Sequence, residues 1–159
     1  MKTKLTIELV PSTTWGENLR SMLSKSEWDR IRKSVYEKAK NKCEICGGVG
    51  PKWPVECHEI WQYEEESKTQ FLRGFIALCP KCHQVKHMGR TMSIGKGKQA
   101  TQHLARVNGW SIQDAQYYIE VMFEIWHRRS QENWTLDISW LKDNGFQTID
   151  VLGQNKATK

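Results

Sequence analysis

The chain has 159 residues, of which 38% are hydrophobic and 26% are charged, and its formal net charge is +6. This apolar content is sufficient for a packed core and excludes wholesale disorder, while the length fits one domain with extensions. Apolar runs are only a few residues long, whereas a membrane-spanning helix needs about 20. The basic start is followed by alternating apolar and polar residues and not by an apolar signal core, so we expect a cytoplasmic protein with no membrane contact.

The first half of the chain predicts a strand, a helix and a β-hairpin. Residues 4–10 alternate between apolar and polar side chains, which is the pattern of a half-buried strand. Residues 27–40 carry apolar side chains at helical spacing, behind a capping residue at Ser26. Residues 55–63 and 71–78 predict the two strands of a hairpin with an acidic tip.

The second half predicts three helices and a last strand. Residues 81–87 suit a short helix, and the glycine-containing residues 89–98 form a basic, flexible connection. Helices are then expected over residues 99–107 and 112–129. Residues 134–140 alternate strictly and predict a strand, which could pair with the strand at the N-terminus and so join the two ends of the domain.

Four of the five cysteines form two pairs with a gap of two residues: Cys43, Cys46, Cys79 and Cys82. An odd number of cysteines in such pairs is a poor disulfide framework and is typical of a metal site. Four thiolates complete the coordination of a tetrahedral zinc ion, so we expect a structural zinc site. The segment between the two pairs would be a folded insertion that contains the predicted hairpin. The second pair together with His83 also spells a c-type haem attachment motif, but the first pair and the lack of an export signal argue against haem.

The positive charge is concentrated in the middle of the chain. Residues 67–113 hold eight basic side chains and no acidic one, which exceeds the net charge of the whole chain. This distribution is typical of a surface for a polyanion, most simply nucleic acid, although a solvated basic face without a partner has the same composition. If nucleic acid binds, we expect phosphate contacts from Lys81, Lys86, Arg90, Lys96 and Lys98.

Histidines in two places could bind a second metal ion. His83 and His87 are four residues apart, so on a helix both imidazoles share one face. His58 and Glu59 stand side by side within an apolar stretch of the predicted hairpin. Either motif alone is weak evidence for a metal site. Along the chain, however, His58-Glu59 lies between the two cysteine pairs, and His83 and His87 follow the second pair.

This order, a cysteine pair, then Glu-x-His-x-Ile, then Cys-x-x-Cys-His-x-x-x-His, resembles the HNH endonucleases of the ββα-metal superfamily, in the subgroup stapled by four cysteines. The resemblance covers roughly residues 28–90. It implies an α+β fold in which a hairpin and a helix hold one catalytic metal. Residues 55–60 are similar to the family's Leu-Glu-x-His-His-Ile strand, and residues 74–79 to its Asn-Leu-x-x-Leu-Cys segment, with Gly74 in place of the asparagine.

The resemblance implies a DNA endonuclease that hydrolyses phosphodiester bonds with a divalent ion, Mg²⁺, Mn²⁺, Ni²⁺ or Zn²⁺. His58, His83 and His87 would hold this ion, and Glu59 would stand where the family has its general-base histidine. In the alternative register Cys57 is the ligand and His58 the base, but a soft thiolate suits a magnesium-type site poorly.

Double-stranded DNA is the expected partner, and double-strand cutting by a site that nicks would require a homodimer. The departures at Glu59 and Gly74 leave a second hypothesis open, a zinc-stapled nucleic-acid-binding module with a decayed site. We expect a single domain over residues 1–153, with a helical and strand extension over residues 99–152 and a frayed tail over residues 154–159.

Overall fold

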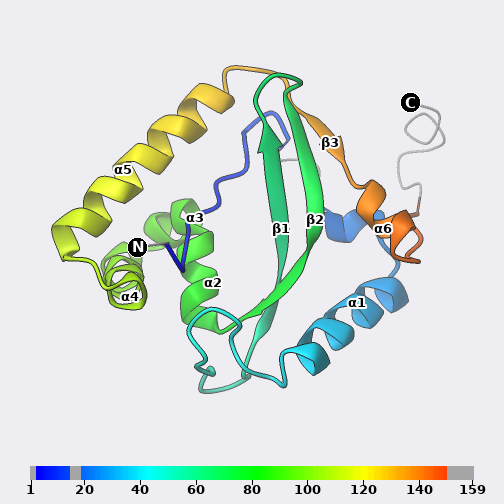
Figure 1. The fold of residues 1–159 in the computed structure, drawn as a ribbon, viewed down its shortest axis with the longest axis horizontal. Helices are drawn as coiled ribbons and strands as arrows, with labels where there is room; N and C mark the ends of the chain where they lie inside the picture. The colour runs from blue at the N-terminus through cyan, green and yellow to red at the C-terminus, as the bar shows by residue number, and fades with distance from the viewer. Residues whose placement is uncertain (1–2, 15–18, 150–159) are drawn as a thin grey trace.

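The computed structural model describes residues 3–14 and 19–149 (Figure 1). It is an α+β structure with a three-stranded sheet and six α-helices in these residues. In chain order the elements are the 3₁₀ helix η1 (Leu19–Met22), α1 (Lys25–Lys38), β1 (Glu56–Glu64), β2 (Thr69–Leu78), α2 (Pro80–Lys86), α3 (Met88–Ser93), α4 (Gly97–Asn108), α5 (Ile112–Arg129), β3 (Thr135–Asp137) and α6 (Ser139–Asp143). In the described residues no helix is long and apolar enough to cross a membrane.

The centre of the fold is the antiparallel hairpin of β1 and β2, which confirms the predicted hairpin. The register is interrupted once, by a bulge between Ile60 and Trp61, opposite Gly74. Gly74 has a φ of 140°, a conformation that residues with side chains rarely adopt. The backbone at this position therefore favours glycine, where the resemblance led us to expect asparagine.

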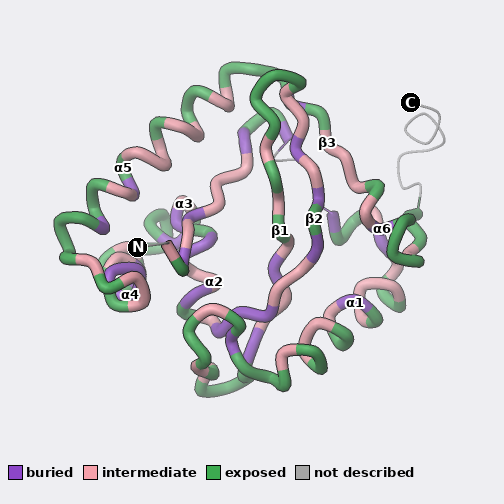
Figure 2. Tube along the Cα trace, in the orientation of Figure 1, coloured by how far each residue is buried: buried purple, intermediate pink, exposed green. Residues whose placement is uncertain are grey.

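The two faces of the hairpin pack against different layers (Figure 1). On one side lie α2, α3, α4 and α5, and their core includes Leu78, Val85 and Leu104. On the other side lie α1 and α6, and their core includes Ile31 and Leu72. Figure 2 shows buried residues along the hairpin and α2, whereas α5 is mainly intermediate or exposed. The hairpin therefore separates two hydrophobic cores and contributes residues to both.

The predicted strand over residues 4–10 is wrong. Leu5 and Ile7 are buried as the alternation predicts, but the segment pairs with no strand of the described residues. Its backbone is instead held by side chains of two helices: Asn108 Oδ1 accepts from Leu5 N, and Tyr118 Oη accepts from Ile7 N. Alternating burial fixes which side chains point inward, but it does not identify the hydrogen-bonding partner.

The predicted strand over residues 134–140 is also largely wrong. Only the three residues of β3 are a strand, and they pair in parallel with β2 and not with the N-terminus. The strand ends because Asp137 Oδ1 accepts hydrogen bonds from the backbone and the hydroxyl of Ser139, where α6 begins. Trp140 therefore belongs to a helix. A hydrogen bond from Thr13 Oγ1 to the Glu132 carbonyl nevertheless connects the N-terminal segment to the turn before β3.

The flexible connection predicted over residues 89–98 is replaced by two ordered helices. In α3 the side chains of Met88 and Thr91 are buried, and Thr91 Oγ1 donates to the Gln84 carbonyl. Gly97 begins α4 and does not form a loop. The helices expected near α1, α2, α4 and α5 are confirmed, although Ser24, not Ser26, caps α1. The tail over residues 154–159 lies outside the described residues.

Candidate metal centres

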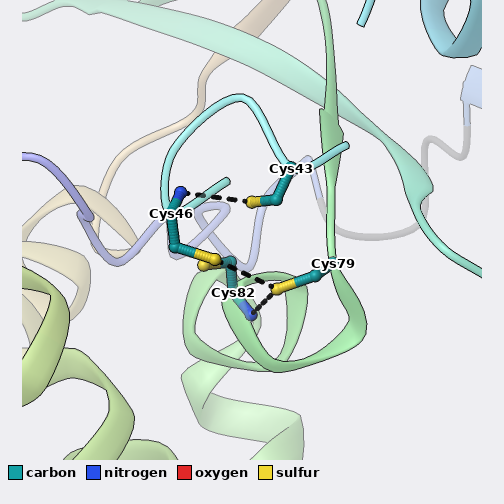
Figure 3. Close-up of side chains that lie close together, drawn as sticks. All are labelled: Cys43, Cys46, Cys79 and Cys82. Atoms are coloured by element: carbon teal, nitrogen blue, oxygen red, sulfur yellow. Dashed lines mark hydrogen bonds between the residues drawn. The ribbon is translucent and has the colours of Figure 1, made fainter. Parts of the chain in front are cut away.

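Each cysteine pair lies in a turn that directs both sulfur atoms to one point (Figure 3). In the first turn the backbone N–H of Cys46 donates to Cys43 Sγ, with an N–S distance of 3.5 Å. In the second, at the start of α2, Cys82 N donates to Cys79 Sγ, also at 3.5 Å. An N–H group that points at sulfur favours the thiolate, which is the form that binds metal.

The four sulfur atoms lie within 4.8 Å of one another, and Cys46 Sγ is 3.6 Å from Cys79 Sγ. A tetrahedral zinc ion with bonds of about 2.3 Å holds its sulfur ligands about 3.8 Å apart, so the observed spacing fits zinc. Burial raises the pKa of the Cys79 thiol to about 11, and the hydrogen bond with Cys43 raises that of Cys82. Four thiolates this close therefore need a cation, and the predicted cluster could bind a structural metal such as zinc.

A histidine that the sequence analysis did not single out contacts the cysteine cluster. His103 Nε2, on α4, lies 3.2 Å from Cys82 Sγ, and the ring is buried. Zinc-bound thiolates accept hydrogen bonds of this kind from a second layer of residues. In the sequence, His103 is marked only as a titratable residue next to the apolar Leu104 in the predicted helix, which does not indicate a contact with the cysteines. His103 links α4 to the cysteine cluster.

The second cluster joins the hairpin to α2. His58 comes from β1, His83 from α2, and His87 is the residue at which α2 ends and α3 begins. Each offers a ring nitrogen within 4.8 Å of the other two, and the ring centroids are 4.7 to 5.2 Å apart. His58 is buried, His83 is half-buried and His87 is exposed, so this histidine triad opens to solvent on one side. These are the three histidines that the sequence analysis assigned to a divalent ion.

The nitrogen positions fit two ligands of one ion. His83 Nε2 and His87 Nε2 are 3.1 Å apart, and ligands about 2.1 Å from one ion are about 3.0 Å apart in octahedral geometry and 3.4 Å in tetrahedral geometry. The Glu56 carboxylate accepts a hydrogen bond from His83 Nδ1 at 2.9 Å. The proton of His83 is thereby held on Nδ1, which leaves the lone pair of Nε2 for a metal.

The electrostatic environment lowers the pKa of two of the three histidines, His58 and His87. Burial, together with the smaller effects of His83 and Lys86, lowers the pKa of His58 to about 3. Desolvation of the ring, followed by the neighbouring His83, also lowers the pKa of His87. Because a histidine binds metal as the neutral imidazole, neither residue needs to lose a proton near pH 7.

Glu59 is not part of this group in the described residues. Across the hairpin His58 pairs with Ile76, whereas Glu59 pairs with Phe75. Directly paired strand residues share a face and neighbours in one strand do not. Ile76 packs on the α2 side and Phe75 packs in the α1 core. The backbone therefore places the expected base on the face opposite the triad.

Besides Glu56, a second carboxylate contacts the triad, that of Glu8 in the segment before η1. Glu8 Oε1 lies 3.1 Å from His58 Nε2. Burial raises the pKa of Glu8 to about 7, against the opposing effect of Lys86. This residue could not be singled out from the sequence, because the local alternation marks it only as one polar position among several, 50 residues from His58.

Four of the five cations expected to contact phosphates are exposed: Lys81, Arg90, Lys96 and Lys98. Arg90 is near enough to His87 to influence its charge. Lys86 differs from the expectation, because its side chain is buried and Nζ donates to Thr6 Oγ1 at 2.7 Å. The structure therefore gives Lys86 an internal partner, and it does not present this residue to a polyanion.

Comparison with protein-family models finds no matching family, and comparisons with curated proteins and with solved structures find no significant match.

Proposed function

We propose that the chain is a metal-dependent DNA endonuclease of the HNH type. The observation that supports this proposal is the convergence of His58, His83 and His87, from a hairpin and the helix that follows it, on one point beside a cysteine cluster. Cys82 and His83 are consecutive residues of α2. A zinc ion at the cysteines would therefore fix the helix that carries a ligand of the second site.

The residues around the triad suit a phosphodiester substrate. A divalent ion bound there would polarise the scissile phosphate and lower the pKa of an attacking water molecule. Three protein ligands leave coordination positions open, and the exposed edge at His87 provides access for a backbone phosphate. Arg90 is the exposed cation that influences His87 electrostatically, and we expect it to pair with a neighbouring phosphate.

The test is cleavage of supercoiled plasmid by the purified protein in Mg²⁺, Mn²⁺, Ni²⁺ or Zn²⁺, with and without chelator. The wild type and a Cys57→Ser control should nick or cut the plasmid, whereas His83→Ala should not, at unchanged zinc content of the cysteine cluster. Cys57 is outside both clusters, so this variant controls for the general effect of a substitution in the hairpin. A wild-type protein that is inert with all four metals would refute the proposal.

A second candidate function is DNA binding without cleavage. It is favoured by the position of Glu59 on the face of the hairpin opposite the triad, which leaves the expected base away from the metal. A binding module should hold duplex DNA with salt-dependent affinity, and the affinity should be the same in His83→Ala. Metal-dependent cleavage that is lost in His83→Ala would exclude this alternative.

A further inference from the structure

We propose that Glu8 is a positioning residue of the histidine triad, and that it makes Nδ1 the metal-binding atom of His58. The inference rests on the proposed metal site and adds a residue from outside the hairpin and helix that define it. Glu8 Oε1 lies 3.1 Å from His58 Nε2, a distance at which the carboxylate can accept the proton of that nitrogen. With the proton held on Nε2, the lone pair of the ring lies on Nδ1.

The state of His58 Nδ1 supports this assignment. The atom is buried and has no hydrogen-bond partner in the described residues. Buried polar atoms almost always have a partner, and one that lacks it calls for an explanation such as an ion. A metal on Nε2 would leave Nδ1 unsatisfied and would also displace the proton that Glu8 accepts. A metal on Nδ1 satisfies both nitrogen atoms.

The arrangement repeats the one around His83, with the two ring nitrogens exchanged. There Glu56 accepts the proton of Nδ1 and Nε2 faces the other ligands. Each of the two histidines thus has one carboxylate that holds the proton on the ring nitrogen away from the metal. Glu56 lies on β1 itself, whereas Glu8 is supplied by a distant part of the chain.

The segment that carries Glu8 is held at several points, so its carboxylate is fixed in place. Glu8 N donates to the Lys86 carbonyl at 3.1 Å, next to His87. On either side of Glu8, Ile7 N donates to Tyr118 Oη, and the Val10 carbonyl accepts from Trp126 Nε1. Both partners lie on α5. The segment passes between α5 and the hairpin, and helices beyond the HNH-like region thereby keep Glu8 against His58 (Figure 1).

Two measurements test the proposal on the full chain with its cysteine site loaded with zinc. The first records ¹⁵N and ¹H signals of the histidine rings before and after a second equivalent of Zn²⁺. We expect His58 to carry its proton on Nε2 and to bind through Nδ1, and His83 to show the reverse. The second titrates Zn²⁺ into variants by calorimetry. Glu8→Ala should bind about 10–100-fold more weakly, the usual cost of losing such a partner. Glu8→Gln, which can still accept the proton, should lose less.

Thr6→Val is the matched control. Thr6 lies in the same segment and contacts Lys86, not His58, so this variant should bind Zn²⁺ at the triad like the wild type. Coordination of Zn²⁺ by His58 through Nε2, or a Zn²⁺ affinity of Glu8→Ala equal to that of the wild type, would overturn the role of Glu8. Either result would still leave a metal site at the triad. A wild type that binds no second ion would overturn both. If the proton pattern is as expected but plasmid stays intact, the role of Glu8 is supported and the nuclease function alone fails.

Discussion

The two clusters share α2 and yet differ in how deeply they are built into the fold. Three of the four cysteines are buried, and they connect the loop after α1, the end of β2 and, through His103, α4. The histidine triad runs from a buried His58 to an exposed His87 at the surface. A site enclosed by the core suits a permanent structural ion, and a site open on one side suits an ion that must accept a substrate. Each prediction below separates these two roles.

The largest expected effect is the loss of the cysteine site. Structural zinc contributes about 10–16 kcal/mol to zinc-finger peptides, which is comparable to the whole stability of about 5–15 kcal/mol of an ordinary domain. Cys82→Ser should therefore abolish cooperative thermal unfolding, followed by circular dichroism. If this variant cannot be purified, removal of zinc from the wild type with a strong chelator should have the same effect. Cys57→Ser should keep the zinc ion of the cysteine cluster and unfold like the wild type. A Cys82→Ser protein with wild-type stability would contradict the structural role.

The second effect separates the triad from the fold. His87 is exposed, so His87→Ala should change the unfolding temperature little. It removes a proposed direct ligand, and we expect Zn²⁺ affinity at the triad to fall by more than the roughly 10–100-fold that loss of an outer partner costs. Calorimetric titration of the zinc-loaded protein measures this affinity. Unchanged binding in His87→Ala would remove His87 from the site.

The third prediction concerns the outer partner of the cysteine site. His103→Leu keeps the volume of a buried side chain but removes the hydrogen bond to Cys82 Sγ. Zinc affinity of the cysteine site should fall by about 10–100-fold, measured by competition with a chromophoric chelator. Binding at the triad should stay the same, since the hydrogen bond of His103 is to Cys82 and not to a histidine of the triad. If His103→Leu lowered zinc affinity at both the cysteine cluster and the histidine triad, the two clusters would not bind metal independently.

The smallest expected effect is the loss of stability on replacing Gly74 with the asparagine of the family motif. Gly74→Asn restores the residue that the family resemblance led us to expect, but the φ of 140° at this bulge is strained for any residue with a side chain. We expect a cost of about 1–3 kcal/mol, or about 2–4 °C in unfolding temperature for each kcal/mol. Gly89→Ala is the control, because its added Cβ would meet Leu9 at an ordinary 3.7 Å and α3 favours alanine. A Gly74→Asn protein as stable as the wild type would refute the backbone explanation.

The sequence was sufficient for features that local spacing determines. The gap of two residues brings each cysteine pair together, and a helical turn aligns His83 with His87. It was insufficient where the partner comes from elsewhere in the chain. The alternation of residues 4–10 showed which side chains are buried, but not that Glu8 meets His58 or that Lys86 turns inward to Thr6. The position of Glu59 on the other side of the hairpin from His58 could have been anticipated, because neighbours in a strand face opposite sides.

The central claim is that the protein has a second, open metal site at the histidine triad in addition to the structural one. It is tested most directly by diffraction from crystals of the protein grown with excess Zn²⁺, with data collected on both sides of the zinc absorption edge. The account predicts two anomalous peaks, one among the four cysteine sulfurs and one among His58 Nδ1, His83 Nε2 and a ring nitrogen of His87. A single peak at the cysteines, with the triad bound to no ion at millimolar Zn²⁺, would contradict it.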